Sequence, residues 1–444
     1  MDTPILDFVQ RYAASGTARL HMPGHKGVGF LGCEALDITE IAGADALYEA
    51  EGIIARSETN AAALFGAART LYSTEGSSQC LRAMLYLALV CRGEGTAPVI
   101  VAARNVHKAF IHAAALLDFE IVWLWPEESC SLCACPVTAE VLERTLDSLV
   151  VPPAAVYVTS PDYLGGMQDI GALAEVAHRY GTILAVDNAH GAYLHFLPRP
   201  LHPLDLGADI CCDSAHKTLP VLTGGAYLHI GNNAPGAFAG NARTAMALFG
   251  STSPSYLTLA SLDRCNRYLS EDYPARLVQT AERLAQVRQQ MTKQGWQVEG
   301  SDPLRITITA PAGCTGLELA DRLRRNGAEC EFADPQHLVV MATPENTAED
   351  LHRLLAALGE NQAPPAGEQP LPLAWGERVC SVREALFVPH ETIPADEALG
   401  RICAAPTVAC PPAIPIAVSG ERIGKEAVQV FRHYGIKTVE VVKE

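Results

Sequence analysis

The sequence has no long apolar run: none of its 444 residues lies in a stretch approaching the roughly eighteen apolar residues that a membrane-spanning helix needs. Residues 1–16 also lack the basic region followed by an apolar one that marks a secretory signal, and they carry Asp2 and Asp7 instead. These absences lead us to expect a cytoplasmic protein with no membrane partner.

Positive charge is scarce in this chain. Its 33 lysines and arginines stand against 50 acidic residues, which gives a formal net charge of −17 and argues against nucleic acid as a partner. An acidic surface can attract a cationic small molecule, but it serves solubility equally well. Apolar residues make up 49% of the chain, a composition typical of a folded protein with two or three domains.

The cysteines lack the pattern of a zinc site. Cys130, Cys133 and Cys135 cluster in a polar stretch, but no matched second pair follows at zinc-site spacing. We therefore expect no metal there, although the sequence leaves the role of the three thiols open. Without a secretion signal, the fourteen cysteines are expected to be reduced, with Cys211 and Cys212 filling a buried strand.

Apolar strand-like runs alternate with helix-like segments between about residues 55 and 230. Ile170, Leu173, Ala174 and Ala177, for example, share one helix face in a segment that Gly181 stops. Continuous apolar strands separated by helices predict a mainly parallel sheet that is buried on both faces. The predicted strands are 99–102, 120–125, 154–158, 183–186, 209–212 and 225–230.

After about residue 265 the pattern changes to that of a smaller α/β lobe. The predicted elements are a helix over 275–293, a strand over 305–309, a helix opened by a Thr315/Glu318 capping box, a strand over 337–341 and a helix over 348–358. Residues 361–372 read as a linker, and the tail holds a helix over 425–433 and a strand over 438–442. We thus predict domains over 1–265, 266–362 and 363–444.

Polar clusters stand just beyond four of the predicted strands. Because the carboxyl ends of parallel strands meet at one edge of a sheet, we expect these clusters to converge there. A fifth cluster of small polar residues, 73–78, precedes a helix-like stretch over 79–90 and suits an anion at the helix N-terminus. The four clusters are 104–108, 159–163, 187–191 and 213–217.

Lys217 ends one of these clusters. A lysine held at a strand end can be partly desolvated, which lowers its pKa and makes the amine a nucleophile toward a carbonyl. Taken alone, Lys217 also fits a surface turn, Asp187 a cap, Ser77 and Ser78 a helix start, and His107 and His190 ordinary loop positions. Together they provide a phosphate loop, an aromatic ring, an acid and a lysine, the set that a pyridoxal phosphate (PLP) site requires.

The order of these residues resembles the fold-type-I PLP-dependent Orn/Lys/Arg decarboxylase family, in its short form without an N-terminal receiver-like domain. The resemblance rests mainly on Asp187-x-Ala-His-Gly191 and Ser214-x-His-Lys-Thr-Leu-Pro220. It implies an α/β, aspartate-aminotransferase-like large domain with a smaller C-terminal lobe. Further matches are residues 21–27, 104–108, 159–161, 252–256, 411–415 and 420–421.

The resemblance also implies roles for individual residues. Lys217 would hold PLP as a Schiff base, and Asp187 would pair with the pyridine nitrogen. His107 would stack on the front face of the ring, and Ala189 would pack behind it. Thr252 and Ser253 would reach a neighbouring subunit's phosphate, so that a homodimer or larger assembly shares its sites. The remaining contacts implied are Ser77, Ser78, Ser214 and His216 with the phosphate and His190 beside the ring.

The implied reaction is decarboxylation of lysine, ornithine or arginine, with the α-carbon protonated by Lys217 or a histidine. An aminotransferase, a lyase or a catalytically silent binding relative are the alternatives. The chain departs from the family pattern at several positions, including Glu75 and Asn188. Candidate partners for a cationic substrate tail are Asp45, Asp162 and Glu421, each of which also fits a capping or surface acid.

Overall fold

The computed structural model describes residues 1–127, 131–364, 376–409 and 412–444. It divides into two compact units, each assembled from separate stretches of the chain. The first unit holds residues 1–97, 154–157 and 170–277, and the second holds 98–153, 158–169 and 278–444. The three contiguous domains proposed above stay a prediction.

The largest sheet has seven strands in the order β1-β7-β6-β5-β4-β2-β3. β2 and β3 pair in parallel, as do β5 and β6, whereas β7 is antiparallel to β6 and to β1. All six predicted strands are present; the seventh, β1, is additional. The strands are β1 Arg69–Ser73, β2 Ala97–Ala103, β3 Glu120–Leu124, β4 Pro153–Thr159, β5 Ile183–Asp187, β6 Ile210–Asp213 and β7 Ala226–Ile230.

The strands of the first unit are buried along nearly their whole length. Every residue of β6 and β7 is buried, and Cys211 and Cys212 are fully enclosed, which confirms their place in the core. Helix α6 (Ile170–Arg179) buries the apolar face predicted for it. The unit's other helices are α1 Pro4–Ala14, α2 Ile53–Leu64, α3 Ser77–Val90, α7 Ala215–Thr218, α8 Gly236–Leu248 and α9 Tyr256–Leu269, with short 3-10 turns at Leu47–Glu49, Ala192–Phe196 and Pro203–Leu206.

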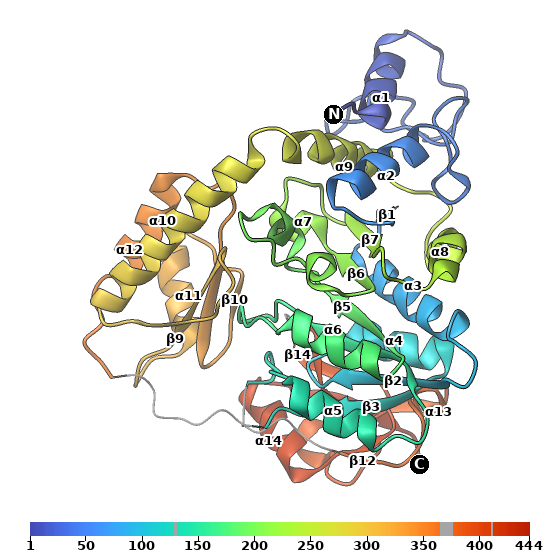
Figure 1. Ribbon diagram of the computed structural model, residues 1–444. Coiled ribbons are helices and arrows are strands. Elements are labelled where there is room, and N and C mark those ends of the chain that lie inside the picture. The colour runs from blue at the N-terminus through green and yellow to red at the C-terminus, as the bar shows by residue number, and fades with distance from the viewer. Residues whose placement is uncertain (128–130, 365–375, 410–411) are drawn as a thin grey trace. The chain divides into compact units, whose positions relative to one another are not determined.

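The second unit contains an antiparallel sheet in the order β10-β11-β9-β8. Helices α10, α11 and α12 lie along it (Figure 1). Thr315 caps α11 and forms the predicted capping box with Glu318. The elements are α10 Tyr273–Lys293, which begins in the first unit, β8 Gln297–Glu299, β9 Arg305–Thr309, α11 Gly316–Arg325, β10 Phe332–Ala333, β11 His337–Met341 and α12 Ala348–Leu358.

In the second unit, the C-terminal residues Ile414, Ile416, Phe431 and Val441 share one core cluster with residues from earlier in the chain, such as Phe332. Cys130, Pro411 and the linker segment 365–372 lie outside the described residues. The remaining elements of this unit are α4 Lys108–Leu117, α5 Ala139–Asp147, β12 Glu377–Arg378, α13 Val382–Leu386, β13 His390–Pro394, a 3-10 turn at Ala395–Glu397, β14 Thr407–Ala409, β15 Ile414–Ala417, β16 Glu421–Arg422, α14 Lys425–His433 and β17 Thr438–Val442. Among the described residues, no helix is long and apolar enough to cross a membrane.

Candidate active site

Lys217 lies on α7, the short helix that follows the carboxyl end of β6. Its Nζ is 3.0 Å from Nε2 of His190, which belongs to the polar segment after β5. The structure thus brings together two of the predicted site residues from adjacent strand ends. Both side chains lie in the first unit, and two nitrogens at this distance can share a proton.

Asp187 is the last residue of β5 and is buried. The Tyr157 hydroxyl donates to its Oδ2 at 3.0 Å, and the Ala189 amide donates to Oδ1 at 3.2 Å. Burial raises the pKa of the Asp187 carboxyl, while the charge of Lys217 and the Tyr157 bond act to lower it. The carboxylate is therefore placed where a further cationic or N–H group would stabilise its charge.

Ser77 and Ser78 open helix α3, as predicted, immediately after Gly76. Gly76 has φ of 74°, a backbone angle that favours glycine, and it gives the helix no side-chain cap. The Ser214 hydroxyl donates to Ser77 Oγ at 2.7 Å, so hydroxyls from two elements meet at this helix N-terminus. Uncapped amides and hydroxyls together suit a phosphate group.

His216 and Thr252 are the remaining predicted site residues of the first unit. His216 Nδ1 lies 3.0 Å from the Gly225 carbonyl oxygen, to which it can only donate, and burial lowers the pKa of this imidazole. Thr252 and Ser253 are exposed in the segment before α9. Their exposure leaves them accessible to another molecule.

His107 belongs to the second unit, where it precedes helix α4. Its Nδ1 accepts the Ala109 amide at 3.1 Å and so caps that helix. The sequence had offered an ordinary loop position for this residue, not a cap, and stacking on a cofactor ring stays a prediction.

The candidate acids for a cationic substrate tail all accept backbone amides. Asp45 accepts five of them, including Gly52 at 2.8 Å and Ile54 at 3.0 Å. Asp162 accepts Leu164 and Gly166, and Glu421 accepts Val418 at 3.0 Å. These contacts support the capping interpretation of all three acids.

The two departures closest to the site also have defined partners. Glu75 accepts the Ser251 amide and so turns toward the segment that contains Thr252. Asn188 donates to Asp213 Oδ1 at 2.7 Å. These two departures leave Lys217, Asp187 and the serines of the α3 N-terminus in place.

Sequence reasoning missed Tyr157 and the partners of Asp213. Tyr157 lies inside β4, where its only signal was an aromatic residue in an apolar strand. Asp213 was placed within a polar cluster but given no role, since its partner His202 is eleven residues away. Pairing of this kind depends on the fold and leaves no periodic pattern.

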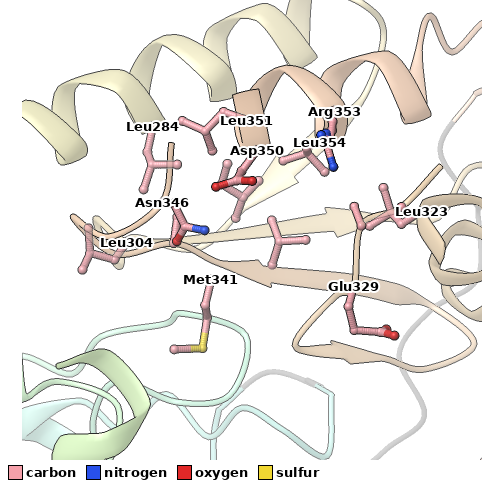
Figure 2. Close-up of a pocket in the computed structure, with 15 residues that line it drawn as sticks. Leu284, Leu304, Leu323, Glu329, Met341, Asn346, Asp350, Leu351, Arg353 and Leu354 are labelled. Carbon is pink, nitrogen blue, oxygen red and sulfur yellow. The ribbon is translucent and has the colours of Figure 1, made fainter. Parts of the chain in front are cut away.

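The pocket in Figure 2 lies in the second unit and contains none of the predicted site residues. Leucines from α10 and α12 face the sheet across it, whereas the Met341 side chain points away from these helices. Its volume is about 220 Å³.

Cys133 and Cys135 are also in the second unit, and both are buried. The Cys135 thiol points toward the Leu124 carbonyl oxygen.

The residues of the first unit fit PLP as a donor set. The uncapped start of α3, with Ser77 and Ser214, suits the phosphate. Buried Asp187 suits a protonated pyridine nitrogen, and Lys217 provides the amine that would hold the cofactor covalently.

Comparison with known proteins agrees with this chemistry. The arginine decarboxylase of Bacillus subtilis (strain 168) is 30% identical over 97% of this chain and 94% of its own length. The lysine decarboxylase of Francisella novicida shares the fold, with a TM-score of 0.81 at 17% identity over 99% of this chain and 81% of that one. The serine palmitoyltransferase of Sphingomonas wittichii covers 80% of this chain and 82% of its own, with a TM-score of 0.57 and 15% identity. These folds confirm the predicted α/β class. Residues 3–347 match the family described as Orn/Lys/Arg decarboxylase, major domain, and the chain belongs to that family.

Proposed function

We propose that this protein decarboxylates a basic amino acid with PLP held on Lys217. The observation that carries the proposal is the pairing of Lys217 Nζ with His190 Nε2 at 3.0 Å, in the same unit as the buried Asp187. Retention of these residues in a member of the Orn/Lys/Arg decarboxylase family argues against a catalytically silent relative.

When bound, PLP would supply an electron sink for the loss of carbon dioxide. The chain's own contribution is orientation and proton handling. The ionised Asp187 would keep the pyridine nitrogen protonated, and Tyr157 would support that charge through its hydrogen bond. Lys217 and His190 would hold the proton that the product amine requires at its α-carbon.

The choice of a basic substrate rests on the family and on relatives named arginine decarboxylase. The three acids considered for the substrate tail bind backbone amides, so they do not supply a ready partner for it. We propose lysine, ornithine or arginine as the substrate and the corresponding amine, a polyamine or its precursor, as the product.

The test is carbon dioxide release by the PLP-loaded protein with lysine, ornithine, arginine and a few neutral amino acids. Release with one basic amino acid, together with its amine, would support the proposal. Conversion of the cofactor to its pyridoxamine form by an added keto acid, without carbon dioxide, would identify an aminotransferase instead. A protein that stays colourless with added PLP would contradict the cofactor assignment.

We further propose a homodimer or larger assembly in the cytoplasm, with sites shared between subunits. Exposed Thr252 and Ser253 support the sharing, since they are free to approach a second copy's phosphate site. Light scattering on the purified protein would report the mass, and a monomer at full activity would contradict the shared site.

A further inference from the structure

Asp213 is a fully buried carboxylate surrounded by hydrogen-bond donors from other elements. His202 Nε2 lies 3.0 Å from its Oδ2, and Asn188 Nδ2 donates to its Oδ1 at 2.7 Å. His229 Nε2 approaches the same Oδ2 to 3.4 Å. Burial by itself would raise the pKa of the Asp213 carboxyl, but the two imidazoles lower it below its usual value. Asp213 is therefore an ionised group in the interior.

The positions of the histidine protons follow from their other contacts. The Leu204 amide donates to His202 Nδ1 at 3.4 Å, so the proton of a neutral His202 must be on Nε2, facing Asp213. His229 Nδ1 lies 2.8 Å from the Thr70 hydroxyl, which can donate to it in the same way. His202 therefore donates to Asp213, whereas His229 Nε2 lies close to the same carboxylate without hydrogen-bond geometry.

A metal ion is the other reading of this cluster. The ligand atoms of His202, Cys211 and Asp213 all lie within 4.8 Å of one another, and all three residues are buried. A metal-binding histidine normally donates through its second ring nitrogen, however, and leaves the first as a lone pair. His202 has the opposite arrangement, because its Nδ1 accepts an amide. The hydrogen bonds therefore favour a carboxylate held by donors over a metal centre.

Asn188 connects this carboxylate to the 187–191 loop, which contains Asp187, Ala189 and His190. The Asn188 backbone amide donates to the Cys212 carbonyl oxygen at 3.0 Å, and its own carbonyl oxygen accepts the Gly191 amide at 2.8 Å. The loop also folds tightly over the Asn188 side chain: a Cβ on Gly191 would lie 2.0 Å from its Oδ1. Asn188 thus ties the loop to the end of β6 through both its backbone amide and its side chain.

We propose that Asp213 is a positioning residue: held by the His202 hydrogen bond, with the His229 imidazole close by, it anchors Asn188 and so fixes the loop that carries Asp187 and His190. Nothing in the family match assigns this role. The inference rests on the proposed function only where cofactor binding is the readout.

The test compares Asp213→Ala with Asp209→Ala. Asp209 is a matched control, since it lies just before the other end of β6 and pairs with His178 Nε2 at 2.9 Å. In the cofactor-free protein, Asp213→Ala should speed hydrogen exchange of the 188–191 amides about tenfold, whereas Asp209→Ala should leave it unchanged.

The dissociation constant for PLP should rise about tenfold in Asp213→Ala alone, because one charged hydrogen bond is worth about that factor. In Asp213→Ala, kcat should fall as PLP binding weakens, while KM for the amino acid stays within about twofold of the parent value.

Asn188→Ala covers the case in which Asp213→Ala does not fold. This variant leaves both histidines beside Asp213 and removes only the side-chain bond between Asp213 and the loop, so it should reproduce the faster exchange and the weaker PLP binding. Exchange and PLP affinity within about twofold of the parent in Asn188→Ala would overturn the proposal. One equivalent of zinc in the parent protein that Asp213→Ala lacks would overturn it in favour of a metal centre. If the parent binds no PLP, the proposed function fails, but the exchange comparison still decides the role of Asp213.

Discussion

Two buried carboxylates, Asp187 and Asp213, end the adjacent strands β5 and β6 and have opposite surroundings. Burial raises the pKa of Asp187, and Lys217 and Tyr157 offset this only in part. The pKa of Asp213 is lowered, because two imidazoles offset its burial. Asp213 thus has its donors within the fold, whereas Asp187 would gain most from the protonated nitrogen of a bound cofactor.

Replacing Lys217 by alanine tests the residue on which the proposed function depends most directly. Lys217→Ala should reduce carbon dioxide release by at least about a thousandfold, since it removes the group that holds the cofactor and a proton. Borohydride should fix PLP to Lys217 in the parent protein, as located by mass spectrometry. Lys293→Ala, at an exposed site on α10, is the control and should stay active. Undiminished turnover in Lys217→Ala, with unchanged circular dichroism, would rule out the role.

Tyr157→Phe tests the support given to Asp187. The change removes one hydroxyl that donates to the carboxylate at 3.0 Å, so PLP affinity should fall about tenfold, the usual value of a hydrogen bond to a charged group. Tyr227→Phe removes a buried hydroxyl that bonds Asn266 instead, and it should lower stability without weakening PLP binding. A fluorescence titration with PLP measures both, and equal affinities in the two variants would contradict the role of Tyr157.

Single site residues were predictable where they follow the end of a recognisable apolar strand. Lys217 and Asp187 follow apolar runs whose length and composition define β6 and β5, so the chain alone placed them at one sheet edge. His202 and Tyr157 carry no such signal, because each meets its carboxylate through pairing between elements. The helix cap that His107 provides was likewise not predicted, since the sequence offered it only as an ordinary loop histidine.

Among the elements, helix α1 shows how distant residues complete a local structure. Thr3 provides no cap for its N-terminus. Instead Asp263, on α9, accepts the amides of Ile5 at 2.9 Å and Leu6 at 3.0 Å, and it also accepts the Ser57 hydroxyl. Burial raises the pKa of Asp263 to about 6, despite these hydrogen bonds.

This raised pKa makes stability depend on pH in a defined direction. The folded state binds the proton of Asp263 more tightly than the unfolded chain, whose carboxyl has a pKa near 3.8. Its contribution to stability is therefore complete below about pH 4 and is lost as pH rises through about 6, by roughly 2–3 kcal/mol. Asp263→Asn should remove this dependence. Urea unfolding at pH 4.5 and 7.5 should show the variant gaining stability relative to the parent at the higher pH.

The control for this comparison is Asp321→Asn, on an exposed face of α11. Its stability should follow that of the parent at both pH values. Parallel stability curves for Asp263→Asn and the parent would contradict the assignment of the titrating group.

Most elements were predictable because their apolar periodicity is strong. The strands β9 and β11 and the helices α12 and α14 have the predicted bounds. Strand β1 was not predicted, since Arg69, Thr70 and Ser73 interrupt its apolar character. The antiparallel direction of β7 was also beyond the sequence, because strand direction depends on which distant strand it pairs with.

On the scale of the whole molecule, the chain alternates between two units. Short segments such as 154–157 and 158–169 fall in different units although they are consecutive. Composition and linkers cannot signal such a division, because no change in composition accompanies it.

One segment of the first unit exposes an unusual amount of apolar surface. Within residues 20–31, the exposed fraction is 94% for Leu20, 80% for Phe30 and 90% for Leu31, and Met22 and Val28 are also more than half exposed. Single exposed apolar residues are common, but several in one short segment are typical of an interface. This supports the proposed dimer, because a second copy of the chain is the partner that shared sites require.

The double variant Phe30→Ser, Leu31→Ser should therefore weaken the assembly rather than the fold. Both side chains are nearly fully exposed in one copy, so their loss should change the unfolding free energy by less than about 0.5 kcal/mol. Sedimentation should show the parent as a dimer at micromolar concentration and the variant shifted toward monomer. Leu399→Ser, at an exposed leucine outside this segment, should leave the mass unchanged. If Thr252 completes a neighbour's phosphate site, the variant's PLP affinity should fall as it dilutes to monomer, and a monomer that binds PLP as tightly as the dimer would refute shared sites.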